Sequence, residues 1–317
     1  MIKIGSSVPA LRSNYSDVAV ILPAYNEAQV VGDTVESFKN ALPGCTVVVC
    51  NNRSTDLTAE VASTAGALVI DEQAPGKGNA VRRLLATVDA ELYVMADADT
   101  TYDAHAARSM IALLEQDHLD MVTGVREHVD QAAYRRGHVL GNVFFNKLFS
   151  NLFKTKTKDV FSGYRVLSGR FARALPVQAV GFEIETEMSA VASILKLSTG
   201  EHPVKYRPRP SGSHSKLSTF SDGLKILNTY VRLLRYFYPK RFYGFFAIII
   251  GLISFLLGAP IVIEFIETGL VPRLPTAVLS SSLGIISTLL IMIGLVLDST
   301  AKSRIELRQL MFLIYKS

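Results

Sequence analysis

The sequence predicts an α/β domain with a doubly wound, mostly parallel sheet, followed by a C-terminal hairpin of two transmembrane helices. Two observations lead to this prediction. Between residues 18 and 95, short apolar runs alternate with polar stretches of helical length, which is the rhythm of a sheet covered by helices. Towards the C-terminus, residues 242–263 and 274–297 contain no Asp, Glu, Lys, Arg or His.

Four short apolar runs are the expected strands. They span residues 18–22, 46–50, 67–70 and 92–95, and the stretches 28–39, 57–65 and 79–88 are the expected helices. The runs are nearly unbroken and rich in β-branched residues, as a parallel sheet buried on both faces requires. Ligands bind beyond the carboxyl ends of such strands, so the polar residues that follow each run are the first candidates for a site.

The apolar content of the chain places part of it in a membrane. The 317 residues are 49% hydrophobic with a mean hydropathy of +0.27, which is high for a wholly soluble protein. At ~1.5 Å per residue, each uncharged run can cross a hydrocarbon core of roughly 30 Å, although a buried helix of a soluble protein is the alternative. The net charge of +5 could indicate nucleic acid, but the densest basic segments, 232–241 and 302–316, border the apolar runs. The preference of basic residues for the cytosolic side explains them better, and no nucleic-acid partner is expected.

The distribution of basic residues also predicts that both termini lie in the cytosol. Basic residues precede the first span and follow the second, whereas Arg273 is the only one between them. Residues 1–17 have no apolar core of signal-peptide length, so we expect the globular part to stay cytosolic, as in a bacterial inner-membrane protein. The expected organisation is a cytosolic domain at 1–216, an amphipathic interfacial helix at 217–240, two transmembrane helices within 241–298 (about 242–266 and 274–297), and a basic cytosolic tail at 299–317.

Two motifs at the expected strand ends suggest phosphate and metal chemistry. Asp97 and Asp99 follow the last run, and carboxylates there can grip Mg²⁺ or Mn²⁺ while open coordination positions take diphosphate oxygens. Two acids in a turn are also often solvated or cap a helix. Gly76-Lys77-Gly78 could bring a backbone and an ammonium group close to phosphate, or could be a plain glycine turn. It lacks the spacing of a Walker loop, and no Rossmann glycine fingerprint occurs, which argues against ATPases and dehydrogenases.

The order of four motifs resembles that of the family 2 glycosyltransferases of GT-A fold. The motifs are Ile21-Leu22-Pro23-Ala24-Tyr25-Asn26-Glu27, Ser54-Thr55-Asp56, Gly76-Lys77-Gly78 and Asp97-Ala98-Asp99. Two later stretches, Asp159-Val160-Phe161-Ser162-Gly163-Tyr164-Arg165 and Arg209-Pro210-Ser211-Gly212-Ser213-His214-Ser215-Lys216-Leu217, resemble the polyprenyl-phosphate branch, which includes dolichol-phosphate mannose synthase. The resemblance covers most of the chain and implies a metal-dependent hexosyltransferase that uses a nucleotide-sugar.

The resemblance also implies roles for individual residues. The nucleotide-sugar would contact Pro23, Tyr25, Glu27, Asn51, Asn52, Lys77 and Asp97, and the metal and diphosphate would contact Asp97 and Asp99. Two departures from the family stand out. The family usually has two aspartates at Asn51 and Asn52, so this contact is neutral and nucleotide preference could shift. It often has Gln at Thr101, which is a poorer metal ligand and puts one coordination position in doubt.

Arginines in the second half of the cytosolic domain are candidates for binding an acceptor phosphate, because a guanidinium is a planar, permanently charged fork. A surface role is the alternative for any one of them. The expected acceptor set is Arg126, Arg135, Arg136, Ser162, Arg209, Ser215 and Lys216, with Arg136 and Arg209 favoured. The expected catalytic set is Asp97, Asp99, Arg136, Arg165 and Arg209.

Three glutamates, Glu183, Glu185 and Glu187, precede an apolar stretch at 188–197. Either they are acids favoured by the positive end of a helix dipole, or one of them lines the acceptor site. A phosphate acceptor is already anionic near neutral pH, so the reaction needs little help from a base. No general base is therefore assigned.

The expected reaction is inverting transfer of a hexose or N-acetylhexosamine from a nucleotide-sugar, UDP-linked rather than GDP-linked, to a polyprenyl (undecaprenyl or dolichyl) phosphate at the membrane. One alternative is a transferase acting on a glycan hydroxyl or a polysaccharide synthase, although two spans are few for a translocation channel. Another is an inactive membrane scaffold, which the departures at Asn51, Asn52 and Thr101 would suit. Association into a homo-oligomer through the spans stays open.

Overall fold

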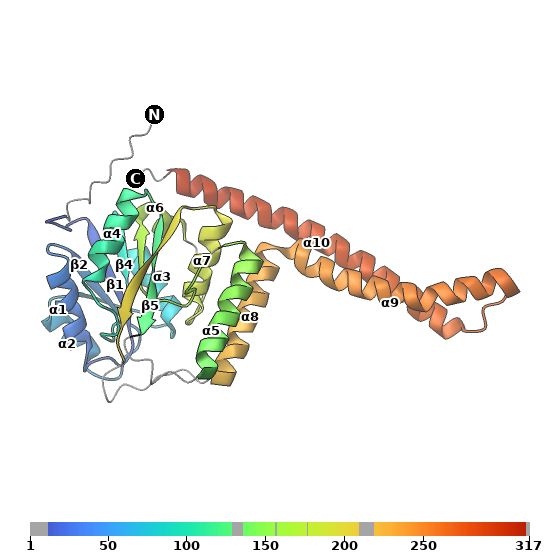
Figure 1. The fold of residues 1–317 in the computed structure, drawn as a ribbon, viewed down its shortest axis with the longest axis horizontal. Coiled ribbons are helices and arrows are strands. Elements are labelled where there is room, and N and C mark those ends of the chain that lie inside the picture. The colour runs from blue at the N-terminus through green and yellow to red at the C-terminus, as the bar shows by residue number, and fades with distance from the viewer. Residues whose placement is uncertain (1–11, 129–135, 156, 176, 209–218, 315–317) are drawn as a thin grey trace. The chain divides into compact units, whose positions relative to one another are not determined.

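The computed structural model describes residues 12–128, 136–155, 157–175, 177–208 and 219–314. The chain divides into two compact units, Met1–Gly223 with Arg308–Ser317, and Leu224–Leu307. The larger unit contains the sheet and the smaller one contains most of the long C-terminal helices (Figure 1).

A seven-stranded mixed sheet forms the centre of the larger unit, with strand order β3-β2-β1-β4-β6-β5-β7. The strands are β1 Val18–Ala24, β2 Thr46–Asn51, β3 Leu68–Asp71, β4 Leu92–Met95, β5 Met121–His128, β6 Arg165–Ser168 and β7 Thr199–Tyr206. The first four are mutually parallel, and β7 is parallel to β5. β6 lies antiparallel between β4 and β5. The predicted α/β class and its mostly parallel sheet are confirmed.

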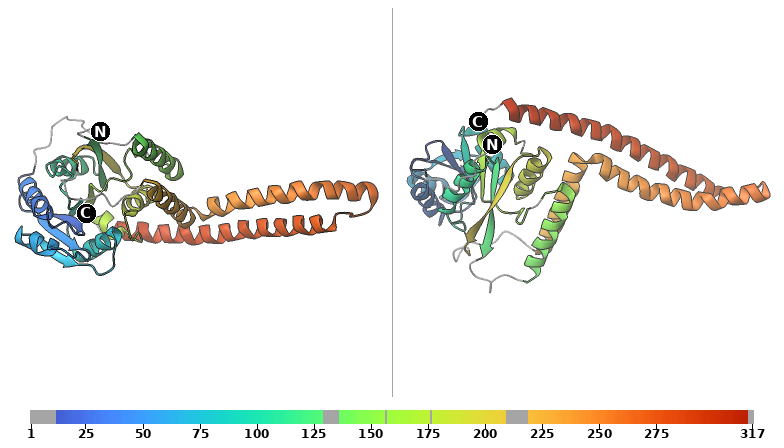
Figure 2. Two further views of the ribbon diagram at one scale, coloured as in Figure 1. Left: turned by 90° about the horizontal axis from the view of Figure 1, so that it is seen from below. Right: turned by 45° about the horizontal axis from the view of Figure 1, so that its top comes forward.

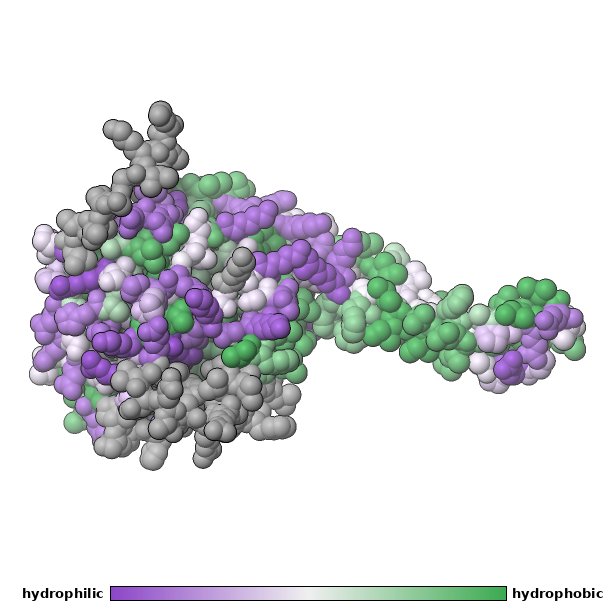
Figure 3. All heavy atoms as spheres, viewed as in Figure 1, coloured by the Kyte–Doolittle hydropathy of each residue, from purple (hydrophilic) through white to green (hydrophobic). Residues whose placement is uncertain are grey.

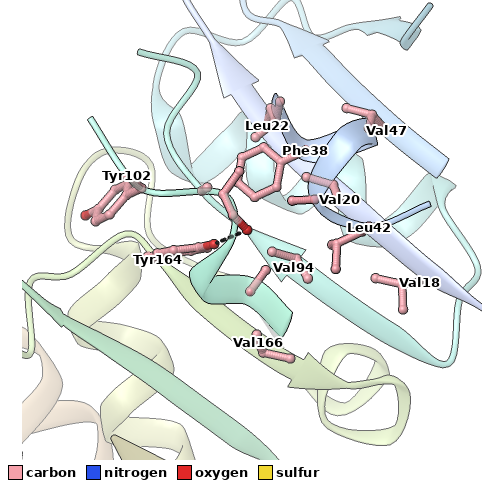
Figure 4. Packing of buried hydrophobic residues seen from close by; sticks show 14 of the residues in the cluster. Val18, Val20, Leu22, Phe38, Leu42, Val47, Val94, Tyr102, Tyr164 and Val166 are labelled. Atoms are coloured by element: carbon pink, nitrogen blue, oxygen red, sulfur yellow. Dashed lines mark hydrogen bonds between the residues drawn. The ribbon is translucent and has the colours of Figure 1, made fainter. Parts of the chain in front are cut away.

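Helices cover both faces of this sheet. They are α1 Val31–Ala41, α2 Thr58–Thr64, α3 Lys77–Thr87, α4 Ala106–Gln116, α5 Arg136–Phe153, α6 Gly169–Ala174 and α7 Ile184–Ile194. Successive side chains of a strand point to opposite faces, so alternate residues build separate cores. On one face, Val20, Leu22 and Val94 pack with Phe38 of α1 and Tyr164 (Figure 4). On the other face, α3 packs on β1 and β2.

Three long helices follow the sheet domain: α8 Thr219–Phe237, α9 Pro239–Thr268 and α10 Leu274–Ile314. Both α9 and α10 are long and apolar enough to cross a membrane. Most of their large apolar side chains are exposed, and hydrophobic residues gather over them in Figure 3. The two helices are therefore compatible with the predicted transmembrane hairpin.

Small residues line the contact between α9 and α10, which run side by side in both views of Figure 2. The hydroxyl of Ser254 donates to the carbonyl of Ser280 at 2.8 Å, and the hydroxyl of Ser280 donates back at 2.9 Å. The buried residues of α10 are Ser280, Ser287, Gly294 and Ala301, which recur at the heptad spacing of packed helices. Close approach through small residues with interhelical hydrogen bonds is typical of helix pairs in lipid.

The residues of the expected basic tail, as far as Ile314, form the last part of α10. The structure continues α10 as one helix of 41 residues to Ile314, well past the end of the apolar run. No Gly or Pro follows Asp298 to stop the helix. Asp298 and Lys302 form an ion pair one helical turn apart, at 3.0 Å, which favours continuation.

Candidate functional site

A cavity of about 510 Å³ lies where β1, β2 and β4 end. Carboxyl ends of parallel strands meet at one edge of a sheet, so segments distant in sequence converge there. The cavity is lined by Pro23, Ala24, Tyr25, Glu27, Asn52, Arg53, Thr55, Pro75, Gly76, Lys77, Ala80, Asp97, Ala98, Asp99, Phe182 and Tyr206. The structure thus brings together the predicted residues Pro23, Tyr25, Glu27, Asn52, Lys77, Asp97 and Asp99.

The turns after β1 and β2 interlock through hydrogen bonds. The backbone N–H groups of Asn26 and Glu27 donate to the hydroxyls of Ser54 (3.1 Å) and Thr58 (2.9 Å). In return, the side-chain oxygen of Asn26 accepts from the N–H of Thr55 at 2.8 Å. These bonds join the motif after β1 to the Ser-Thr-Asp turn, so each one holds the other at the cavity wall.

Asn51 and Asn52, where the family resemblance leads us to expect aspartates, form hydrogen bonds with other groups of the protein. Asn52 is buried, donates to the carbonyls of Glu72 (3.2 Å) and Ala74 (2.7 Å), and accepts from the N–H of Gly76 (2.7 Å). Asn51 donates to Asp71 at 2.8 Å and does not line the cavity. An amide both donates and accepts, which a carboxylate cannot do, so Asn52 suits this loop-holding position. A nucleoside contact by either asparagine stays a prediction.

The glycines of Gly76-Lys77-Gly78 allow another segment to cross over them. The N–H groups of Gly78 and Asn79 donate to the carbonyl of Val180, at 2.9 and 3.4 Å, so they face protein rather than a phosphate. A Cβ on Gly76 would collide with Val180, and one on Gly78 with the carbonyl oxygen of Ala179. Glu187 on α7 fixes the crossing segment by accepting the N–H of Ala179 at 2.7 Å. For the backbone of this motif, the structure favours the glycine turn over phosphate binding. A contact with phosphate would then come from the side chain of Lys77.

Replacing Gly78 with Ala is expected to destabilise the larger unit by about 1–3 kcal/mol, because the added methyl group must displace the backbone at Ala179. Thermal unfolding of the full-length protein in detergent measures this as a lower Tm. Gly244→Ala in α9 is the control, since a Cβ there meets nothing within 4 Å. A Gly78→Ala protein as stable as the wild type would contradict the crossing geometry.

Lys77 joins two carboxylates at the cavity wall. Its Nζ lies 2.5 Å from Oδ1 of Asp97 and 2.5 Å from Oε1 of Glu185. Burial alone would lower the pKa of Lys77, but the two carboxylates outweigh it and raise the pKa, so the side chain is a cation. Burial raises the pKa of Glu185, although Lys77 pulls it down in part. Gly163 packs against this group, since a Cβ there would lie 3.0 Å from both Lys77 Nζ and Asp97 Oδ2.

Asp97 and Asp99 supply the chemistry that a divalent cation needs. Both line the cavity, and their hard oxygen donors are of the type preferred by Mg²⁺ and Mn²⁺. Within the described residues, no group of three or more His, Cys, Asp or Glu side chains that could hold a metal ion is found. The two carboxylates by themselves fit such an ion by the type of their oxygen donors. Thr101 is fully buried and its hydroxyl donates to Asp99 at 2.5 Å, so it orients this carboxylate.

Arg126 lies beside the cavity but is already paired. It forms two hydrogen bonds with Asp159, of 2.7 and 2.8 Å, and its guanidinium lies over the ring of Tyr206 at 5.5 Å. Burial would lower the pKa of Arg126, but Asp159 raises it. Tyr206 lines the cavity whereas Arg126 does not, so Arg126 packs on the ring of a cavity residue. Binding of an acceptor phosphate by Arg126 stays a prediction.

Arg165 and Ser162 lie in the core and do not line the cavity. Arg165 is fully buried and donates to the carbonyls of Val160 (2.9 Å) and Ser162 (3.1 Å) and to the hydroxyl of Ser189 (3.0 Å). Burial lowers the pKa of Arg165 to about 10. The structure thus places Arg165 where it holds the loop before Gly163, and any effect on catalysis would pass through that loop.

Most of the predicted acceptor residues lie beyond the described part of the chain. Arg135, Arg209, Ser215 and Lys216 fall outside the described residues. Arg136 begins α5, but its side chain is not described. The acceptor side of the site therefore stays a prediction.

Several residues of the site were not singled out by the sequence. Arg53, Phe182 and Tyr206 line the cavity, and Gly163 faces the Lys77 group. Arg53 directly follows Asn52, so the expectation that ligands bind beyond the carboxyl ends of parallel strands could have identified it. Phe182 and Tyr206 come from segments far along the chain, and no local pattern in the sequence predicts that they line this cavity.

Comparison with known proteins agrees with this geometry. Glycosyl transferase family 2 matches residues 19–175. Glycosyltransferase AglJ of Haloferax volcanii is 33% identical over 208 residues, which cover 65% of this chain and 68% of that protein. The dolichyl-phosphate hexose transferase of the same organism is 29% identical over 223 residues, covering 69% and 94%.

The fold also matches solved structures. Glucosyl-3-phosphoglycerate synthase from Mycobacterium tuberculosis, in complex with Mn²⁺ and UDP-glucose, superposes with a TM-score of 0.54 at 23% identity, covering 68% of this chain and 77% of that one. The larger unit accordingly has the GT-A fold, and its four strand-end motifs converge on one cavity as that fold requires. With the sequence relatives above, this establishes that the chain belongs to glycosyltransferase family 2.

Proposed function

We propose that this chain transfers a hexose or N-acetylhexosamine from a nucleotide-sugar, preferentially a UDP-sugar, to a polyprenyl phosphate with inversion at the anomeric carbon. The observation that carries the proposal is the cavity lined by Asp97, Asp99 and Lys77, in a chain that also has two helices able to span a membrane. The dolichyl-phosphate hexose transferase supports the acceptor class by its name. The synthase complex makes UDP-glucose and Mn²⁺ the first ligands to test.

Asp97 and Asp99 would hold the divalent ion. When bound, Mg²⁺ or Mn²⁺ would neutralise negative charge on the diphosphate leaving group. Lys77 adds a fixed positive charge to the same wall, already oriented by Asp97 and Glu185. Groups that are oriented before the reaction stabilise developing charge without reorganising. Pro23, Tyr25 and Arg53 form the wall on which the nucleoside would lie.

The acceptor would be held through its phosphate group. Its phosphate is anionic near neutral pH because its second pKa is about 6, so positioning matters more than a base. We assign this positioning to Arg136 and Arg209, with Arg126, Arg135, Ser215 and Lys216 in support. A catalytic unit and termini on the cytosolic face of a bacterial inner membrane would place the lipid phosphate within reach.

The test is incubation of the full-length protein in detergent with Mn²⁺, undecaprenyl phosphate and, in parallel, UDP-glucose, UDP-N-acetylglucosamine or GDP-mannose, followed by mass spectrometry of the lipids. We expect the mass of one sugar to be added to the lipid with a UDP-sugar. Transfer to a free glycan but never to the lipid would contradict the acceptor assignment. An α-linked product from the α-linked donor would contradict direct displacement.

A further inference from the structure

A strained residue directly follows the Asp97-Ala98-Asp99 motif. Thr100 has a φ of 58°, in the left-handed region. For a β-branched side chain this conformation is a genuine outlier and is strained. In the described part of the chain, five other non-glycine residues have positive φ, and none of the five is β-branched. A cost at this place calls for a compensating contact and suggests a functional reason.

The conformation of Thr100 is held from neighbouring elements. Its N–H donates to the hydroxyl of Thr34 at 3.2 Å, and its own hydroxyl donates to the carbonyl of Asp99 at 2.7 Å. Thr34 is buried on α1 and is fixed in turn by donating to the carbonyl of Val30 at 3.0 Å. The turn is therefore anchored to α1, which is remote from it in sequence.

The next residue is fixed as well. Thr101 donates to Oδ1 of Asp99 through both its N–H (3.2 Å) and its hydroxyl (2.5 Å), and its carbonyl accepts from the N–H of Arg207 at 2.9 Å. Thr100 lies between Asp99 and Thr101, so its backbone conformation determines how Thr101 meets the Asp99 carboxylate. Asp99 is 2% exposed, so solvent has little access to this carboxylate.

We propose that Thr100, kept in the left-handed conformation by Thr34, is a positioning residue that fixes the Asp99 carboxylate before a cation and diphosphate bind. The inference rests on the proposed function, since it assigns Asp99 to that ligand pair. A turn that is already ordered spares the ligand the cost of ordering it. Fixing one residue's backbone costs about 1–2 kcal/mol, which corresponds to roughly 5- to 30-fold in affinity.

The test separates ligand affinity from stability. Thr100→Gly removes the strain but frees the turn, so the Tm of the full-length protein should equal or exceed that of the wild type. Calorimetric titration with UDP and Mn²⁺ should nevertheless give a Kd about 5-fold higher or more. His118→Gly is the matched control: His118 has a φ of 50°, is exposed, and precedes β5 at the opposite edge of the sheet, so the Kd should not change.

A second pair of variants examines the anchor. Thr34→Val removes the acceptor for the Thr100 N–H while keeping the shape, and should raise the Kd, whereas Thr34→Ser keeps the hydroxyl and should restore it. Equal affinities of wild type and Thr100→Gly would overturn the inference while leaving the proposed function intact. A Thr100→Gly protein that loses Tm together with affinity would show a merely structural role. Failure of the wild type to bind nucleotide would overturn both.

Discussion

Replacing Asp99 with Asn is expected to lower the rate of sugar transfer by about 100- to 1,000-fold. The substitution removes one negative charge and one hard oxygen donor from the cavity wall but keeps the shape of the side chain. The hydroxyl of Thr101 can still donate to the amide oxygen of Asn, so the turn should fold as before. The loss should therefore fall on metal binding, and the Tm should stay close to that of the wild type.

The measurement is the initial rate of transfer over a titration with Mn²⁺, in the full-length protein. Asp103→Asn is the matched control, because Asp103 is close in sequence but does not line the cavity and accepts the N–H of His105 at 3.1 Å, which Asn can also do. We expect the control to keep its rate and its metal requirement. An Asp99→Asn protein with an unchanged rate and unchanged Mn²⁺ dependence would show that another group holds the ion.

The parts of the fold that the sequence predicts are those fixed by local pattern. The runs at 18–22, 46–50 and 92–95 became β1, β2 and β4, because unbroken apolar segments of that length must be buried in a sheet. The expectation that ligands bind beyond the carboxyl ends of these strands then gave the position of the cavity. By contrast, the insertion of β6 between β4 and β5 depends on pairing between distant segments, such as Val94 with Val166, which no local pattern encodes.

The site shows the same division. Asp97, Asp99 and Lys77 could be identified from motifs, but the contact of Lys77 with Glu185 joins residues far apart in the chain. The sequence left Glu185 between a dipole-favoured acid and a site residue, because burial decides between them and the sequence does not report burial. Arg165 was expected in the catalytic set from its motif, and the sequence does not report that its side chain is buried and holds a loop in the core.

Replacing Lys77 with Met is expected to lower the free energy of unfolding by about 3–5 kcal/mol near neutral pH, since it leaves the carboxylates of Asp97 and Glu185 without their shared cation. The size of the loss should depend on pH. Burial already raises the pKa of Glu185 in the folded protein, and Lys77 opposes this rise. A group with a raised folded pKa contributes stability that is full below its unfolded pKa and is lost as pH rises through the folded pKa.

Without Lys77 the pKa of Glu185 in the folded protein should rise further above its unfolded value of about 4.3. Glu185 then stays protonated up to a higher pH, and the stability that depends on its protonation is lost only at that higher pH. The deficit in Tm relative to wild type should thus be smaller at about pH 5 than at about pH 8.

The double variant Lys77→Met with Glu185→Gln removes the buried charge together with its partner, and its deficit should be smaller than that of Lys77→Met and nearly independent of pH. A flat pH profile for Lys77→Met would mean that Glu185 is not held by Lys77.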